Sequence, residues 1–257
     1  MRQILRVWFT LVSRSVEDLI SILEENKVDT VISALGGLAP PEAEKALIHA
    51  AEASSVTRRF IPSVSGIKHR RDQAWFPAAQ AKLAAMAELE RTSLERTIVC
   101  NGFFLDYWGM PKVKSYLSTP VVLTYSVDVA KYTAALLTLE KWEQESYAIG
   151  TKLSLNEFLR LAEEVRGTEF KKVHDSLELL QSRKITELLG HRFAYDHVPK
   201  EALQGMLATF GVLFDEGQFD FKPERSLNDI FPDIKPMSAK EMLEIGWRGL
   251  KLDLHVE

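Results

Sequence analysis

The residues that could bind a charged ligand follow a short, nearly continuous apolar run. Residues 31–35 (Val-Ile-Ser-Ala-Leu) precede Gly36-Gly37, a pattern typical of a strand that is covered on both faces. The carboxyl ends of parallel strands border the ligand crevice in open α/β sheets, so this end is a candidate binding edge. The basic run 68–71 (Lys-His-Arg-Arg) could contact a phosphate or an acidic partner. A solvated loop is its simpler interpretation.

Several other kinds of chemistry are disfavoured. Residues 1–14 contain no glycine, so the G-x-G-x-x-G turn that opens a dinucleotide-binding fold does not precede the apolar run. The single cysteine, Cys100, excludes an intramolecular disulfide and a cysteine-based zinc site. The six histidines lack metal-binding spacing, and we expect no metal. Ser65-x-x-Lys68 matches a serine-hydrolase pattern, but such a short match arises by chance and its companion motifs are absent.

Composition predicts a soluble globular protein. The chain has 257 residues, of which 46% are apolar and 26% are charged, enough for one large domain with a smaller lobe. A formal charge of -4 argues against nucleic acid as the partner. The apolar run at residues 4–12 is far shorter than the roughly 20 residues of a membrane span and lacks a cleavage site. We therefore expect a buried strand there and a cytoplasmic protein without a membrane partner.

Strands and helices are expected to alternate along the chain, which favours a parallel sheet. Ser15 and Asp18 form a capping box at the start of a helix over about 15–26. The same reasoning predicts strands at 31–35, 59–63, 96–100, 121–125 and 147–149, and helices at 41–53, 78–91, 126–139, 154–167, 176–188, 199–214 and 238–246. Ser126, Ser154 and Ser238 are the expected N-caps of three of them, and Gly167 is an expected helix end.

Five segments, in order, resemble the NmrA-like branch of the atypical short-chain dehydrogenases. This branch includes the isoflavone reductase and phenylcoumaran benzylic ether reductase type. The resemblance is strongest to its fungal members. The five segments are residues 28–36, 59–63, 81–82, 101–108 and 128–131. The resemblance implies a Rossmann-like parallel sheet in residues 1–125 and a small, closely packed α+β substrate lobe in residues 126–257. It also implies NADPH as hydride donor, a small-molecule substrate and, often, a place in fungal secondary metabolism.

The same resemblance implies roles for particular residues. Lys82 matches the lysine beside the nicotinamide, which binds the ribose and acts as an acid or a base. An ammonium there would stabilise the charge that develops on the acceptor when hydride is transferred. The remaining cofactor-binding positions are Ser33, Ala34, Leu35, Phe103, Phe104, Leu105 and Asp106. The simpler interpretations are a surface lysine for Lys82 and core packing for the phenylalanines.

The chain also departs from the family pattern. Relative to that pattern, we expect the first βαβ unit to be missing, the stretch near residues 114–121 is short, and Ala78 stands where a classical short-chain dehydrogenase has tyrosine. We therefore expect an incomplete sheet, as in an N-terminally truncated protein. The leading hypothesis is an NADPH-dependent oxidoreductase of a small metabolite. The alternatives are a non-catalytic regulator that senses NAD(P) and an inactive truncated product, and the oligomeric state stays open.

Overall fold

A computed structural model describes residues 15–35, 40–73, 77–107, 120–170, 172–192, 194–196 and 198–247. The chain divides into two compact units. The first comprises Met1–Cys100 with Leu139–Ser146, and the second comprises Asn101–Thr138 with Tyr147–Glu257. The domain boundary that the sequence predicts after residue 125 stays a prediction. The strand expected at residues 4–12, and with it the question of a missing first βαβ unit, lies outside the described residues.

The first unit contains the predicted parallel sheet. Strands β1 (Thr30–Ile32), β2 (Arg59–Ile61) and β3 (Glu95–Arg96) pair in that order, with Val31 opposite Phe60 and Phe60 opposite Arg96. A separate pair joins β4 (Ile98–Cys100) to β7 (Glu145–Tyr147). The prediction that the first of these strands runs to Leu35 is wrong, because β1 ends at Ile32. The amide of Ser33 still donates to the Ile61 carbonyl, at 2.8 Å, and the chain then leaves the sheet.

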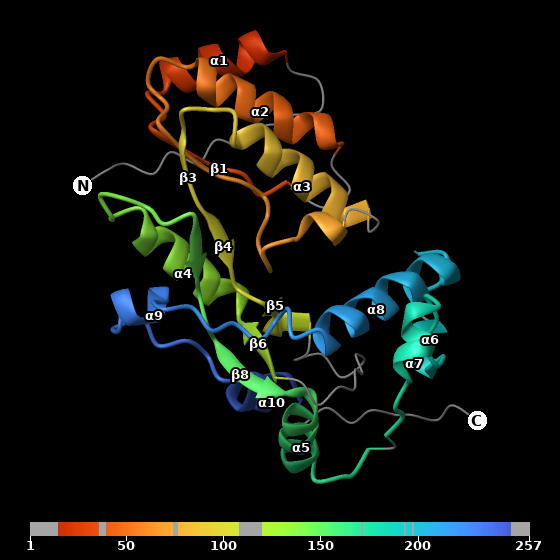
Figure 1. The fold of residues 1–257 in the computed structure, drawn as a ribbon. Helices are drawn as coiled ribbons and strands as arrows, with labels where there is room; N and C mark the ends of the chain where they lie inside the picture. Colours follow the sequence, from red (N-terminus) through yellow and green to blue (C-terminus); the bar gives the residue numbers. More distant parts are fainter. Residues whose placement is uncertain are drawn as a thin grey trace. The chain divides into compact units, whose positions relative to one another are not determined.

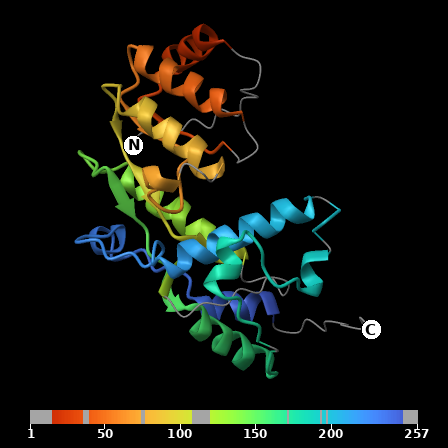
Figure 2. The ribbon, with the colours of Figure 1, turned by 45° about the vertical axis from the view of Figure 1, so that its right-hand side comes forward.

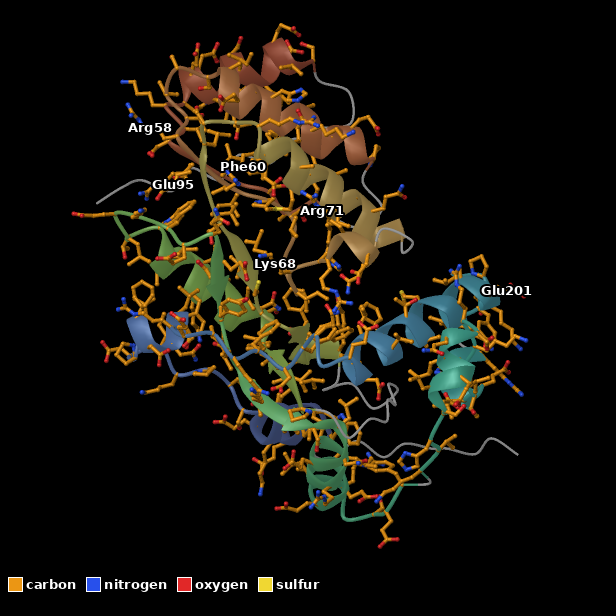
Figure 3. The ribbon with its side chains drawn as sticks, in the orientation of Figure 1. Arg58, Phe60, Lys68, Arg71, Glu95 and Glu201 are labelled. Atoms are coloured by element: carbon orange, nitrogen blue, oxygen red, sulfur yellow. The ribbon has the colours of Figure 1, made fainter. Side chains whose placement is uncertain are left out.

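Three helices lie side by side in this unit: α1 (Val16–Glu25), α2 (Pro41–Ala53) and α3 (Pro77–Leu89) (Figure 1). Their apolar faces arise from residues spaced three and four apart. They bury a core around Phe60, which is labelled in Figure 3 and has no exposed surface. The Ser15 and Asp18 capping box of α1 is confirmed. The core members on the helices are Leu19, Leu23, Ile48, Ala50, Ala51, Ala85 and Leu89.

Arg59 connects the segment Leu139–Ser146 to the rest of the first unit. Its Nε atom lies 2.7 Å from a Glu95 carboxylate oxygen, and its Nη1 atom donates to the Leu139 carbonyl at 3.0 Å. The guanidinium also lies over the Trp142 ring, 4.8 Å from the ring centroid. The Trp142 amide donates to Glu95 at 2.7 Å. These contacts place the residues that follow Trp142 beside β4.

The second unit contains a mixed sheet of three strands: β5 (Phe103–Phe104), β6 (Pro120–Thr124) and β8 (Thr151–Ser154). The first two are parallel and the last two antiparallel. Gly102 precedes β5 with φ of 71°, and a Cβ atom there would lie 2.0 Å from the Val122 carbonyl oxygen. The helical elements of the unit include η3 (Leu105–Tyr107), α4 (Ser126–Leu136), α5 (Leu155–Arg166), α6 (Leu177–Gln181), α7 (Leu189–Arg192), α8 (Lys200–Asp215), α9 (Leu227–Ile230) and α10 (Ala239–Trp247). Figure 2 shows α6 beside α8 and α5 beside α10.

The helices of the second unit match several predicted boundaries. Ser154 and Glu157 form a capping box on α5, and Gly167 ends that helix in the left-handed conformation. The predicted N-cap role of Ser126 is wrong, because Ser126 is already inside α4 and Tyr125 is the N-cap residue. The helix predicted over 176–188 is too long, because α6 ends at Gln181. Strand β8 and helix α9 were not predicted, and the strand predicted over 147–149 lies at Glu145–Tyr147.

Candidate active site

The candidate site lies in the first unit, where the segment after β2 passes helix α3. Lys82, on α3, is half-buried, and its ammonium donates a hydrogen bond to the Ser65 carbonyl at 3.0 Å. Burial lowers the pKa of Lys82. A lysine that loses solvation in this way is a better proton donor near neutral pH than an exposed one, because its charged form is disfavoured.

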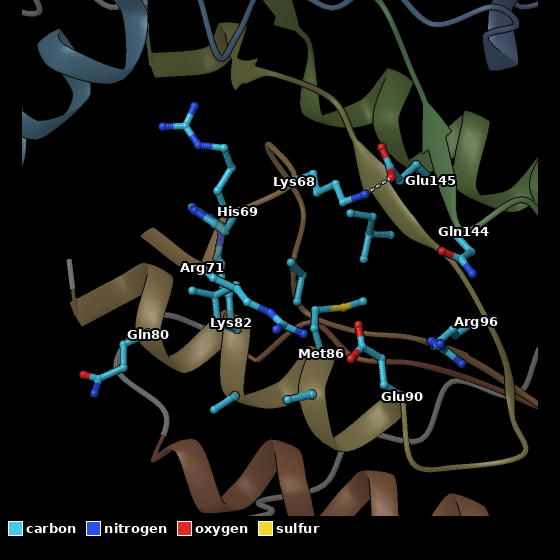
Figure 4. A pocket seen from close by; sticks show the side chains of 16 residues that line it. Lys68, His69, Arg71, Gln80, Lys82, Met86, Glu90, Arg96, Gln144 and Glu145 are labelled. Atoms are coloured by element: carbon cyan, nitrogen blue, oxygen red, sulfur yellow. Dashed lines mark hydrogen bonds and ion pairs between the residues drawn. The ribbon is translucent and has the colours of Figure 1, made fainter. Parts of the chain in front are cut away.

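A cavity of about 620 Å³ opens beside Lys82. One face of α3 lines it with Lys82 and Met86, four residues apart, and Glu90 continues the same spacing just after the helix (Figure 4). Ala85 and Leu89, also four residues apart, lie on another face of the helix and are buried in the core. The helix therefore packs against the sheet with one face and presents Lys82 to the cavity with the other.

His69 is the titratable neighbour of Lys82. Burial, and then the Lys82 charge, lower the pKa of His69 to about 4, and Gln73 partly opposes the shift. The buried Nδ1 atom of His69 has no hydrogen-bond partner within the described residues. The imidazole is therefore neutral at pH 7, and Lys82 is the cation of this pair.

The cavity lining carries more positive than negative charge. Besides His69, five basic side chains and the carboxylates of Glu90 and Glu145 line it. Lys68 forms an ion pair with Glu145 (Figure 4), and Arg70 forms one with Asp72 at 3.1 Å. In the described part of the chain Arg71 and Arg96 form no ion pair. The five basic residues are Lys68, Arg70, Arg71, Lys82 and Arg96.

Ser33, Ala34 and Leu35 directly follow the carboxyl end of β1, and their assignment to the cofactor stays a prediction. Ser33 is buried and its hydroxyl donates to the Glu44 carboxylate at 2.6 Å. Ala34 is exposed and Leu35 half-buried. The Leu35 carbonyl accepts a hydrogen bond from the Ser63 hydroxyl at 2.7 Å. This network brings the end of β1 to the segment that contacts Lys82.

The second unit contains Phe103, Phe104, Leu105 and Asp106, whereas Lys82 belongs to the first unit. Phe103 packs edge to face against Phe210, with ring centroids 5.0 Å apart. Leu105 has no exposed surface. Both carboxylate oxygens of Asp106 bind Ser126, one its amide at 2.9 Å and the other its hydroxyl at 2.6 Å. Their assignment to the cofactor stays a prediction, and Asp106 has a structural role at the start of α4.

Sequence reasoning missed Glu44 and did not assign His69 a role. His69 was part of a basic run with a solvated loop as its simpler interpretation, whereas its side chain is half-buried beside Lys82. Glu44 carried no signal, because its partners Ser33 and Ser63 are 11 and 19 residues away in the sequence. The described residues contain no group of three or more potential ligands that could bind a metal ion. Nor does any helix among them have the length and apolarity to cross a membrane.

Comparisons with solved structures identify the fold. The NADPH complex of leucoanthocyanidin reductase from Vitis vinifera superposes with a TM-score of 0.72 at 16% identity, covering 93% of this chain and 84% of that one. A crystal structure of isoflavone reductase gives 0.71 at 17% identity, with 90% and 78% covered. This chain has the isoflavone reductase-like fold. The predicted α/β class and the stated resemblance are confirmed.

Curated relatives of this chain are fungal oxidoreductases. Oxidoreductase BOA1 of Botryotinia fuckeliana is 29% identical over 247 residues, which cover 86% of this chain and 78% of the relative. Oxidoreductase swnN of Metarhizium robertsii is 28% identical over 292 residues, covering 93% and 84%. No family model matches the chain. The relatives agree with the oxidoreductase predicted from the sequence.

Proposed function

We propose that the protein is an NADPH-dependent reductase of a small metabolite and that Lys82 is its proton donor or acceptor. The observation that carries the proposal is the half-buried Lys82 ammonium on a cavity lined in part by the segment that follows the parallel strand β2. The similarity to fungal oxidoreductases and the fold shared with a reductase solved in complex with NADPH support it. Aromatic or polyketide-like compounds of fungal secondary metabolism are the substrate class we favour.

The residues present fit a phosphate-bearing cofactor. Ala34 is exposed at the end of β1, where the backbone can approach a ligand closely. Basic side chains outnumber carboxylates around the cavity, which favours an anionic ligand. The unpartnered Nδ1 atom of His69 is a further polar group available to it. Ser33, Ala34, Leu35 and Lys82 would bind the cofactor on this unit, and NADPH would supply the hydride.

Lys82 would do two things in the reaction. Its charge would stabilise the negative charge that develops on the acceptor as hydride arrives, and its Nζ proton would then pass to that atom. The Ser65 carbonyl orients the ammonium. Because His69 is neutral at pH 7, it adds no second charge that would compete for the same anion.

Binding and turnover measured separately test the proposal. NADPH binding is followed by calorimetry, and NADPH oxidation is followed with a panel of aromatic ketones and enones. We expect Lys82→Met to bind NADPH within about threefold of wild type and to lose roughly 100-fold or more in turnover, the range of general acid catalysis. Lys45→Met, which removes a lysine of α2 outside the cavity lining, is the matched control. Turnover by Lys82→Met equal to wild type would refute the assignment.

A further inference from the structure

Glu44 is a buried carboxylate that joins the ends of two neighbouring strands. It lies on α2 and is 8% exposed. One carboxylate oxygen accepts the Ser33 hydroxyl at 2.6 Å, just after β1. The other accepts the Ser63 amide at 3.0 Å, just after β2. A buried carboxylate is costly unless such charge-assisted bonds satisfy it, so this geometry fixes Ser33 and Ser63 relative to α2.

Hydrogen bonds hold the segment 62–66 in place on both sides of the Ser65 carbonyl, which accepts a hydrogen bond from the Lys82 ammonium. On one side Ser63 is bound through its amide to Glu44 and through its hydroxyl to the Leu35 carbonyl. On the other side the Gly66 amide donates to the Val99 carbonyl at 3.4 Å. The Ser65 carbonyl lies between these two connections and accepts the Lys82 ammonium.

We propose that Glu44 is a positioning residue for Lys82, acting through Ser63 and the Ser65 carbonyl. This inference rests on the proposed acid or base role of Lys82. Glu44 is not among the residues that line the cavity, and its carboxylate binds Ser33 and Ser63. Its carboxylate sets where the Ser65 carbonyl lies, and this carbonyl sets where the Lys82 ammonium points. Without the carboxylate, segment 62–66 loses one of its connections, and Lys82 gains water.

The test compares Glu44→Ala, Glu44→Asp and Glu44→Gln in the full chain without cofactor. The matched control is Glu42→Ala, which removes an exposed carboxylate from the first turn of the same helix. The Lys82 titration is followed by NMR of lysine labelled at Cε, assigned with Lys82→Arg. Amide exchange reports on Ser63 and its neighbours.

We expect Glu44→Ala to raise the pKa of Lys82 toward the ordinary lysine value, because water replaces the fixed carbonyl. We also expect about tenfold faster exchange at Ser63, as for the loss of one hydrogen bond to a charged group. Glu44→Gln, which keeps an acceptor for the Ser63 amide, should restore most of the wild-type titration. Glu42→Ala should leave both readouts unchanged.

A folded Glu44→Ala with an unchanged Lys82 titration would overturn the proposal and leave Glu44 a purely structural residue. If Glu44→Ala does not fold, Glu44→Asp decides, because its shorter side chain cannot reach both Ser33 and Ser63. An unchanged Lys82 titration in that variant would likewise refute the proposal. These readouts need no NADPH, so failure of the proposed function, seen as absent cofactor binding, is a separate result.

Discussion

The neutral state of His69 makes the stability of the protein depend on pH in a defined window. The unfolded chain takes up a proton on this histidine near pH 6.5, whereas the folded chain does so near pH 4. Between these values the unfolded state binds more protons, so stability falls as the pH is lowered. The difference between the pKa of 6.5 in the unfolded chain and about 4 in the folded chain corresponds to a contribution of at most about 3 kcal/mol to the free energy of unfolding. Between pH 7 and pH 4.5 it amounts to about 2 kcal/mol.

Replacing His69 by Gln, which resembles the neutral ring, should remove this loss. We expect wild type to lose about 2 kcal/mol more than His69→Gln between pH 7 and pH 4.5, measured by urea unfolding with tryptophan fluorescence. His174→Gln, at an exposed histidine of the second unit, should behave as wild type. NMR of the histidine rings should show His69 titrating near pH 4. Equal losses in wild type and His69→Gln, or a ring that titrates near 6.5, would refute the burial of His69 beside Lys82.

Three further predictions concern neighbouring features. Lys82→Met should raise the pKa of His69 but leave it below 6.5 in the ring titration, because burial is the larger cause of the shift and remains. An unchanged His69 pKa would show that the two side chains are not close to each other. Gly102→Ala should destabilise the protein by several kcal/mol in urea unfolding, because its Cβ would lie 2.0 Å from the Val122 oxygen; an unchanged midpoint would contradict this. Cys100 should resist thiol reagents at pH 8 until the chain unfolds, because burial raises its pKa to about 12; rapid native labelling would contradict it.

The sequence predicted elements whose signals are local. Ser15 with Asp18 and Ser154 with Glu157 occur at the expected helix starts, since a capping box needs only residues three apart. Gly167 ends α5 for a similarly local reason, its positive φ. By contrast β8 was missed, because its partner strand β6 is distant in the sequence. The helix expected over 176–188 stops early, and Arg183 beyond it has a φ of 62°.

The candidate site was predictable only in part. Lys82 came from the family resemblance and the end of β1 from its apolar run before two glycines, and both lie in the same unit. Ser126 was taken as an N-cap from its position alone, whereas Asp106, 20 residues away, binds its amide. Glu44 and His69 depend on burial that arises only when α2, α3 and the sheet pack together. Such tertiary contacts leave no periodic trace in the sequence.

Hydrogen exchange of the chain with and without NADPH tests the central claim most directly. If the cavity beside Lys82 is the reductase site, NADPH should slow exchange in residues 33–35 and in the segment 62–73, and saturating NADPH should protect the same residues in Lys82→Met. Absence of NADPH binding, or protection confined to other residues while these exchange unchanged, would contradict the account.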